Sequence, residues 1–127
     1  MQDTRPVFLE LWRIRLPASG YVSILHRISG VLMVLSIPFA AWLFEHALSG
    51  PAGFEQAAAV LGSWPARLIL LLLTWSLLHH LFAGIRFLLL DLHIGLDRAT
   101  ARHSAVTAIA AGVIATLLVL ALGGGVQ

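Results

Sequence analysis

Apolar residues form three long runs along the chain, at residues 28–44, 68–85 and 105–122, and polar segments separate them. None of the three runs contains Asp, Glu, Lys or Arg, and only the second contains histidines, His79 and His80. Runs of 17 or 18 residues extend roughly 25–27 Å as helices, close to the ~30 Å hydrocarbon core of a bilayer. Because backbone groups in lipid must be paired within their own segment, each run is predicted to be a transmembrane helix.

The polar segments predict the helix ends. Pro17 interrupts the chain before the first span and Ser19 is its predicted N-cap, while Ser63 and Pro65 have the character of an N-cap and a first-turn proline for the second span. Pro38 is expected to kink the first span. The chain is therefore read as one all-α membrane-anchor domain over residues 1–127. Its expected parts are a cytoplasmic or interfacial segment at about 1–19, with an interfacial stretch at 8–16; spans at 20–48, 65–90 and 104–123; an external loop at 49–64 that carries a short helix near 54–61; and a cytoplasmic loop at 91–103.

Composition supports this class. Hydrophobic residues make up 59% of the 127 residues and charged residues 11%, whereas a soluble domain is about one quarter charged. A water-soluble domain is therefore excluded, and the lipid bilayer is the first expected partner. The chain contains no cysteine, which excludes disulfides, thiolate metal sites and cysteine nucleophiles.

All eight basic residues are arginines, and they are distributed unevenly. Four precede the first apolar run and three lie between the second and third, against Arg67 alone on the other side. The positive-inside rule then predicts a cytoplasmic N-terminus. The N-terminal segment lacks the pattern of a secretory or transit peptide, so a bacterial inner membrane is the expected location. The arginines form no single soluble basic face, so nucleic acid is not an expected partner.

The third run carries a stripe of small residues, Ala108, Gly112 and Thr116, at spacings of four. Such stripes let two helices approach closely in lipid. We expect this stripe to be a packing face for another helix.

The second run carries the more informative polar residues, because intramembrane histidines are functional candidates. Ser76, Ala83 and Gly84 share the helix face of His80 and are all small. A flat macrocycle ligated by His80 would need that space, whereas the face of His79 carries bulkier residues such as Trp75. His80 is therefore the candidate axial ligand of a haem. A neutral core histidine that hydrogen-bonds across helices fits the same spacing, and both readings stay open.

The start of the first span carries a polar face. Ser23, His26, Arg27 and Gly30 recur at helical spacing. These groups could hydrogen-bond a quinone carbonyl or a haem propionate. The alternative is an ordinary helix start in which Arg27 snorkels to the interface.

A haem with two axial histidines would need both at one depth in the membrane. His26 is placed near the interface, whereas His80 lies six residues before Arg86, or ~9 Å deeper. The two depths match poorly, so a second ligand is expected from another subunit. Asp91 follows Arg86 by five residues, and the two form a candidate network at the cytoplasmic edge. The simpler interpretation, which the pattern favours, is a solvated or Arg-paired interface residue. No nucleotide-binding, zinc-protease or hydrolase motif is present, so no catalytic residue is predicted.

Three elements together resemble the cytochrome b subunits of succinate dehydrogenase, a family of haem-binding membrane anchors in respiratory complex II. They are an Arg-Pro pair near the start, S-x-x-H-R-x-S-G in the first span, and H-x-x-x-G-x-R followed by Asp in the second. In this chain they are Arg5-Pro6, residues 23–30, and His80 to Arg86 with Asp91. The order and spacing match over nearly the whole chain.

The resemblance implies a four-subunit assembly of a flavoprotein, an iron–sulfur protein and two small membrane anchors, which passes electrons from succinate to ubiquinone. It implies that His80 ligates the iron of haem b, with the second ligand from the other anchor. It also implies that His26 and Arg27 lie near the haem propionates, and that Ser23 and Arg27 belong to the ubiquinone site. The chain has no succinate site of its own.

One position departs from the family pattern, because Phe87 stands where a second histidine usually follows the arginine. A polar contact near the haem or quinone edge is therefore missing or comes from a neighbour. Two rival functions stay open: an anchor of a fumarate reductase, and a haem-free structural scaffold.

Overall fold

The computed structural model describes residues 15–123, and this part of the chain is helical with no strand. Four helices follow one another: α1 (Ala18–Leu48), α2 (Pro51–Gly62), α3 (Trp64–Asp91) and α4 (Arg98–Gly123). Helices α1, α3 and α4 have 31, 28 and 26 residues and are long and apolar enough to cross a membrane. The predicted all-α fold with three transmembrane helices is confirmed, and so is the short helix in the first loop.

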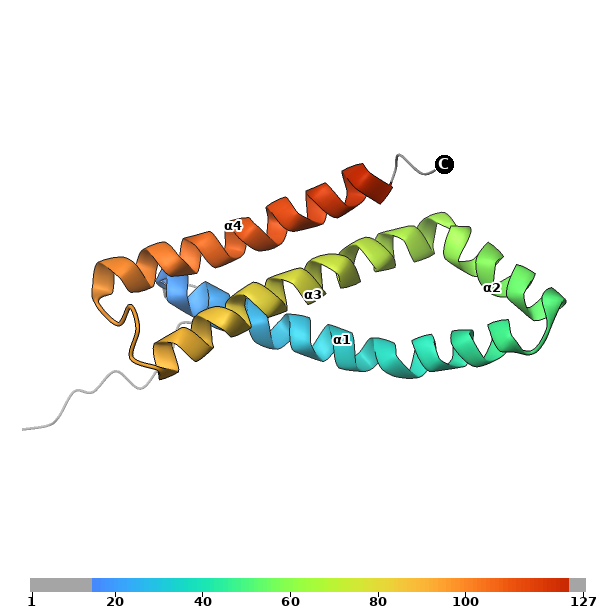
Figure 1. Ribbon diagram of the computed structural model, residues 1–127, viewed down its shortest axis with the longest axis horizontal. Helices are drawn as coiled ribbons and strands as arrows, with labels where there is room; N and C mark the ends of the chain where they lie inside the picture. Colours follow the sequence, from blue (N-terminus) through green and yellow to red (C-terminus); the bar gives the residue numbers. More distant parts are fainter. Residues whose placement is uncertain (1–14, 124–127) are drawn as a thin grey trace, which may run out of the picture.

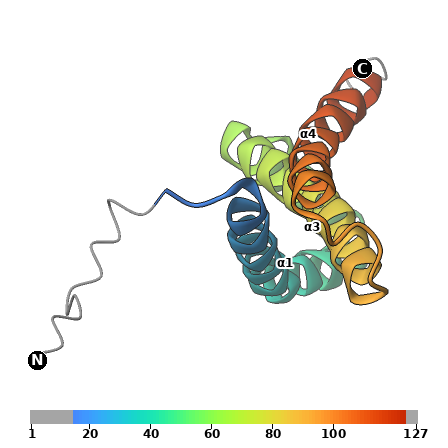
Figure 2. The same ribbon diagram turned by 90° about the vertical axis from the view of Figure 1, so that its left-hand side faces the viewer.

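The three long helices contact one another, and α3 packs most extensively against α4 and α1. Figure 1 shows α1 crossing α3 near the end of the molecule at which α1 begins, while the two helices diverge toward α2. Helix α2 joins their far ends and contacts both. The end-on view in Figure 2 shows α1, α3 and α4 packed together, and within residues 15–123 no fourth long helix closes the bundle. This open bundle is consistent with completion by a partner subunit.

The start of α1 differs from the prediction. The N-cap residue is Pro17, and Ser19 lies inside the helix rather than capping it. The Pro17 carbonyl accepts hydrogen bonds from the backbone N–H groups of Gly20 and Tyr21. The prolyl residue therefore starts the helix through its carbonyl, with no side-chain cap. The predicted interfacial stretch at 8–16 lies outside the described residues, apart from its last two.

The loop between α3 and α4 is shorter than predicted, because α4 begins at Arg98 rather than at 104. A carboxylate oxygen of Asp97 accepts the backbone N–H of Thr100 at 2.9 Å, which is an N-cap bond. Hydrogen bonds from Thr100 lower the pKa of Asp97, and the hydroxyl contributes more than the backbone N–H. The other side of the loop closes in a Schellman arrangement, in which the N–H groups of His93 and Ile94 bond Leu90 and Leu89 carbonyls. His93 takes the left-handed φ of 62°, which glycine usually provides.

The core between the helices is built from small side chains. The predicted stripe Ala108, Gly112 and Thr116 is buried on α4. A Cβ atom at Gly112 would lie 3.1 Å from the Cα atom of His79, so the α3 and α4 backbones are in close contact. The stripe therefore serves packing within this chain. Most large apolar side chains point outward in the isolated chain, as expected for surfaces that face lipid or a partner helix.

Candidate functional site

Two of the predicted site residues meet where α1 and α3 cross. The imidazole rings of His26 and His80 are stacked, with 3.8 Å between ring centroids and 15° between ring planes. The expectation that these histidines lie at different depths is therefore wrong. His26 is eight residues from the start of α1 and His80 eleven from the end of α3, or about 12 and 16 Å along the two helices. Because the two helices cross at an incline, the remaining difference in depth between the two rings disappears.

Glycines on the opposing helix leave room for each ring. A Cβ atom at Gly30 of α1 would lie 3.1 Å from Cε1 of His80, and one at Gly84 of α3 would lie 3.6 Å from Nε2 of His26. Each imidazole is thus accommodated beside a residue that has no side chain. The space at Gly30 is the tighter of the two, because a side chain there would press on the His80 ring, whereas a Cβ atom at Gly84 would only contact His26.

Ser29 and the backbone of α1 hold one nitrogen of His80. The Ser29 hydroxyl donates to the His26 carbonyl at 2.8 Å, and Nδ1 of His80 lies 3.0 Å from the same carbonyl oxygen. Nδ1 is also 3.1 Å from Oγ of Ser29. Ser29 is fully buried. The sequence pattern alone indicates no role for Ser29, although its position three residues after His26 puts it one helical turn further along the same helix.

The second ring nitrogen of His80 is free within residues 15–123. None of these residues hydrogen-bonds to Nε2, and the His80 side chain is only half-buried. His79 differs sharply: it is fully buried, and both of its ring nitrogens are enclosed without a hydrogen-bond partner. Its ring stacks on Trp75 at 5.2 Å. Of the two neighbours, only His80 has a nitrogen that an external group can reach.

The small residues expected to make space beside His80 do something else. Ser76 and Ala83 are fully buried, on the same packed face of α3 as His79 and Arg86. They therefore contribute to helix packing. The expectation that Ser76 and Ala83 make space for a macrocycle beside His80 is wrong. Gly84 alone keeps the predicted position, where it faces the ring of His26.

Ser23 and Arg27 lie one turn apart on α1, on either side of His26 in the sequence. Ser23 is half-buried and Arg27 is exposed. Within the described chain, the Arg27 guanidinium forms no hydrogen bond to another side chain or to the backbone. Both polar groups are therefore available to a molecule that approaches the start of α1.

Arg86 and Asp91 are not brought together. Arg86 is 6% exposed, and its guanidinium donates to Oγ of Ser104 and to the Ala101 carbonyl, both at 3.0 Å. These bonds join α3 to the first turns of α4. Asp91 is exposed at the end of α3. The candidate edge network is therefore an α3–α4 link formed by Arg86 without Asp91.

Phe87, the position that departs from the family pattern, packs its ring edge against His26, with 5.2 Å between centroids and 70° between planes. The Arg86 guanidinium carbon lies 5.4 Å from the centre of the Phe87 ring. Phe87 thus makes an apolar contact beside His26.

A large open cavity of about 1100 Å³ lies between the start of α1 and the first turns of α4. Its lining is mostly apolar and includes Arg98 and Arg102. None of the predicted site residues lines it. The His26–His80 cluster thus remains the candidate site.

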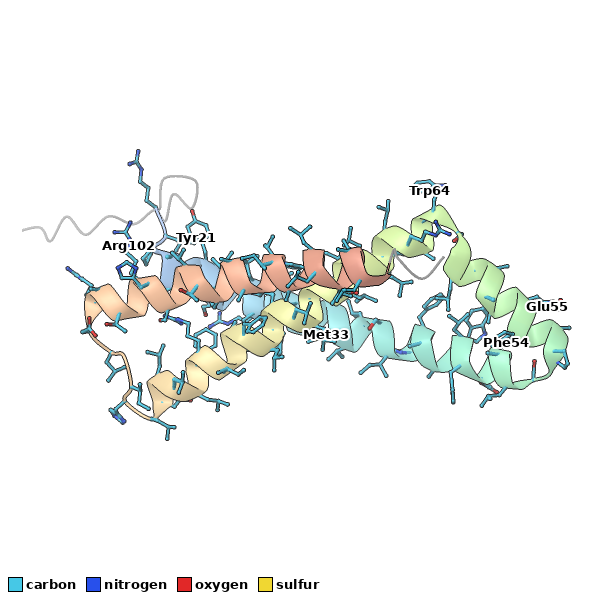
Figure 3. The ribbon with its side chains drawn as sticks, turned by 45° about the horizontal axis from the view of Figure 1, so that its top comes forward. Tyr21, Met33, Phe54, Glu55, Trp64 and Arg102 are labelled. Atoms are coloured by element: carbon cyan, nitrogen blue, oxygen red, sulfur yellow. The ribbon has the colours of Figure 1, made fainter. Side chains whose placement is uncertain are left out.

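The two ends of the molecule differ in charge. Figure 3 shows Tyr21 and Arg102 at one end and Trp64 and Glu55 at the other. Of the six arginines in the described part, five lie at or near the end marked by Tyr21 and Arg102. Arg67 lies near the end marked by Trp64 and Glu55. The site is close to the arginine-rich end. The arginines at that end are Arg15, Arg27, Arg86, Arg98 and Arg102.

Comparison with known proteins gives matches over nearly the full chain. Residues 1–119 match the family described as succinate dehydrogenase/fumarate reductase transmembrane subunit. The succinate dehydrogenase cytochrome b556 subunit of Paracoccus denitrificans is 35% identical over 119 residues, which cover 94% of this chain and 92% of that protein. The subunit of the same name from Coxiella burnetii is 33% identical over 120 residues, with 93% and 95% covered.

Proposed function

Because the chain belongs to the succinate dehydrogenase/fumarate reductase transmembrane subunit family, we propose that it anchors a succinate:ubiquinone oxidoreductase and binds haem b. Both relatives are named as succinate dehydrogenase cytochrome b556 subunits, which favours succinate oxidation over fumarate reduction. Its proposed partners are a second small anchor, an iron–sulfur subunit and a flavoprotein subunit.

The hydrogen bonding of His80 carries the proposal. A carbonyl oxygen can only accept, so the contact between Nδ1 of His80 and the His26 carbonyl requires the proton on Nδ1. Nε2 is then unprotonated, with its lone pair available. An imidazole whose other N–H is bonded to a carbonyl is the usual form of a metal-ligating histidine. His80 thus fits an axial position on haem iron.

A second protein ligand to the haem would come from the partner anchor. The rings of His26 and His80 are only 3.8 Å apart and nearly parallel, so no macrocycle fits between them. His26 therefore supports His80 rather than facing it across an iron. When bound, the haem supplies a one-electron carrier within the membrane; the chain supplies one ligand and an electrostatic environment.

The polar groups at the start of α1 suit two kinds of acceptor. The Arg27 guanidinium, with His26 beside it, can form charge-assisted hydrogen bonds to haem propionates. Ser23, one turn earlier, can donate a hydrogen bond to a quinone carbonyl, and Arg27 lies within reach of both roles. Ubiquinone reduction is accordingly proposed at this end of α1.

The same end is proposed to face the cytoplasm. Arginines concentrate there, as the positive-inside rule requires, and the proposed membrane is the bacterial inner membrane. The hydrophilic subunits would then dock beside the Ser23–Arg27 region, which gives electrons a short path to the quinone.

The ligand assignment is tested by reduced-minus-oxidised absorbance spectra of the complex purified through a tag on this chain. His80→Ala should remove the b-type signal, because the free Nε2 is lost. His79→Ala is the matched control and should keep the signal, since its ring is enclosed. Full haem content in the His80 variant would refute the assignment. An intact wild-type complex without haem would instead support the scaffold.

The quinone assignment is tested by separating two activities. Arg27→Ala should lower succinate:ubiquinone reductase activity by about ten-fold, for one lost charge-assisted hydrogen bond. Ser23→Ala should lower it by about three-fold, for one lost neutral hydrogen bond. Electron transfer from succinate to an artificial acceptor should stay normal, because it needs only the soluble subunits. Ser36→Ala is the control on the same helix. Unchanged quinone kinetics in both variants would count against the site.

A further inference from the structure

We infer that Ser29 is a positioning residue for the ligand histidine: it fixes the proton and the ring orientation of His80, and so tunes the haem. This inference rests on the proposed function. It concerns a residue that touches neither the quinone nor the iron in the proposal, and it follows from contacts between α1 and α3.

Three polar groups meet in one buried place. Oγ of Ser29, Nδ1 of His80 and the His26 carbonyl oxygen are separated from one another by 2.8, 3.0 and 3.1 Å. Ser29 has no exposed surface. Because the Ser29 hydroxyl is enclosed, water does not compete for its side of these hydrogen bonds.

The protons in this triangle can be assigned. The Ser29 hydroxyl has one proton, and the 2.8 Å contact directs it to the His26 carbonyl. The oxygen of Ser29 is then an acceptor toward Nδ1 of His80. The Nδ1 proton is consequently shared between two acceptors, the carbonyl and the hydroxyl, and no tautomer with the proton on Nε2 satisfies both.

The ring plane is held as well. His26 stacks on one face of the His80 ring, and Gly30 lies against its Cε1 atom. Rotation of the ring would break the contacts of Nδ1 and bring the ring toward the α1 backbone. The direction in which Nε2 offers its lone pair is therefore set by α1.

Acceptors on Nδ1–H make an imidazole a stronger electron donor through Nε2. A stronger donor stabilises the oxidised iron and lowers the haem potential. Ser29 is one of the two acceptors. Its removal should therefore raise the haem midpoint potential and change the ligand field, without removing the ligand.

The experiment compares Ser29→Ala with Ser36→Ala in the purified complex. Ser36 is a matched control, because its hydroxyl donates to the Met33 carbonyl in the same local geometry but has no bond to His80. Potentiometric titration and low-temperature electron paramagnetic resonance are the readouts. Ser29→Ala should keep the haem, raise its midpoint potential and shift the low-spin signal, whereas Ser36→Ala should match the wild type.

A haem-loaded Ser29→Ala complex with wild-type potential and spectrum would overturn the inference. If that variant does not assemble, Ser29→Cys keeps the shape with weaker hydrogen bonds and should also raise the potential; no shift there would overturn it. Failure of the proposed function looks different, since the wild-type complex would lack haem or His80→Ala would retain it.

Discussion

His79 and His80 are neighbours in the sequence, yet their surroundings are opposite. His80 has a bonded Nδ1 and a free Nε2, whereas both nitrogens of His79 are enclosed without partners. An enclosed polar group without a hydrogen bond costs roughly 1–3 kcal/mol. The stacking on Trp75 and the contact with Gly112 are what His79 contributes to the packing.

At the residue scale, His79→Phe should therefore leave the complex at least as stable as the wild type, with a gain of about 1 kcal/mol from removing the unpaired groups. The phenyl ring keeps the stacking on Trp75. The check is the thermal midpoint of the haem-loaded complex, with His79→Ala as a control that leaves a cavity and lowers it. A clear loss of stability in His79→Phe would mean that the imidazole has a polar partner, such as a buried water.

Single positions were also where sequence reasoning fell short. Ser29 was part of a quoted motif but received no role, because its value depends on a carbonyl of its own helix and a ring from another. Ser76 and Ala83 are at helical spacing from both His79 and His80, and in the structure they share the buried face of His79. Their packing function was invisible, since periodicity gives a helix face but does not say which element covers it.

At the scale of elements, the α3 and α4 backbones approach each other closely at Gly112. The Gly112 position has no room, because an added Cβ atom would meet backbone atoms of His79 at 3.1 and 3.4 Å. Backbone atoms cannot rotate aside, so the helices would have to separate. The Arg86 bonds to Ala101 and Ser104 would be strained by the same movement.

Gly112→Val should accordingly destabilise the complex by ~3 kcal/mol or more, the upper end for overpacking. Ala110→Val is the matched control, since Ala110 is exposed on the same helix and should tolerate the change. The measurement is the yield and thermal midpoint of the assembled complex. Equal behaviour of the two variants would mean that α3 and α4 are further apart than described.

The helices themselves were largely predictable, because the apolar runs mark what lies in lipid. Their ends were less so: hydropathy placed the start of α4 at 104, but Asp97 caps the helix at Arg98 and polar first turns extend it beyond the apolar run. The depth argument for His26 and His80 failed for a related reason. Counting residues along upright helices ignores how two inclined helices cross.

At the scale of the molecule, the described chain is an incomplete bundle. Its buried residues are few and mostly small, and large apolar side chains cover its outer surface. Lipid can cover part of that surface, but the half-buried His80 needs a neighbour that shields the site from solvent. A second anchor subunit meets both needs, which is why the site and the assembly are proposed together.

The group that orients His80 belongs to a residue 54 positions earlier in the chain, on a different helix. A freshly inserted α3 therefore carries a histidine whose proton is free to sit on either nitrogen. Only after α1 has packed against α3 is the proton fixed on Nδ1, which leaves Nε2 free to bind the haem iron. On the proposed assignment, haem binding is therefore a late step of biogenesis. An anchor in which α1 and α3 have not yet packed against each other does not bind haem.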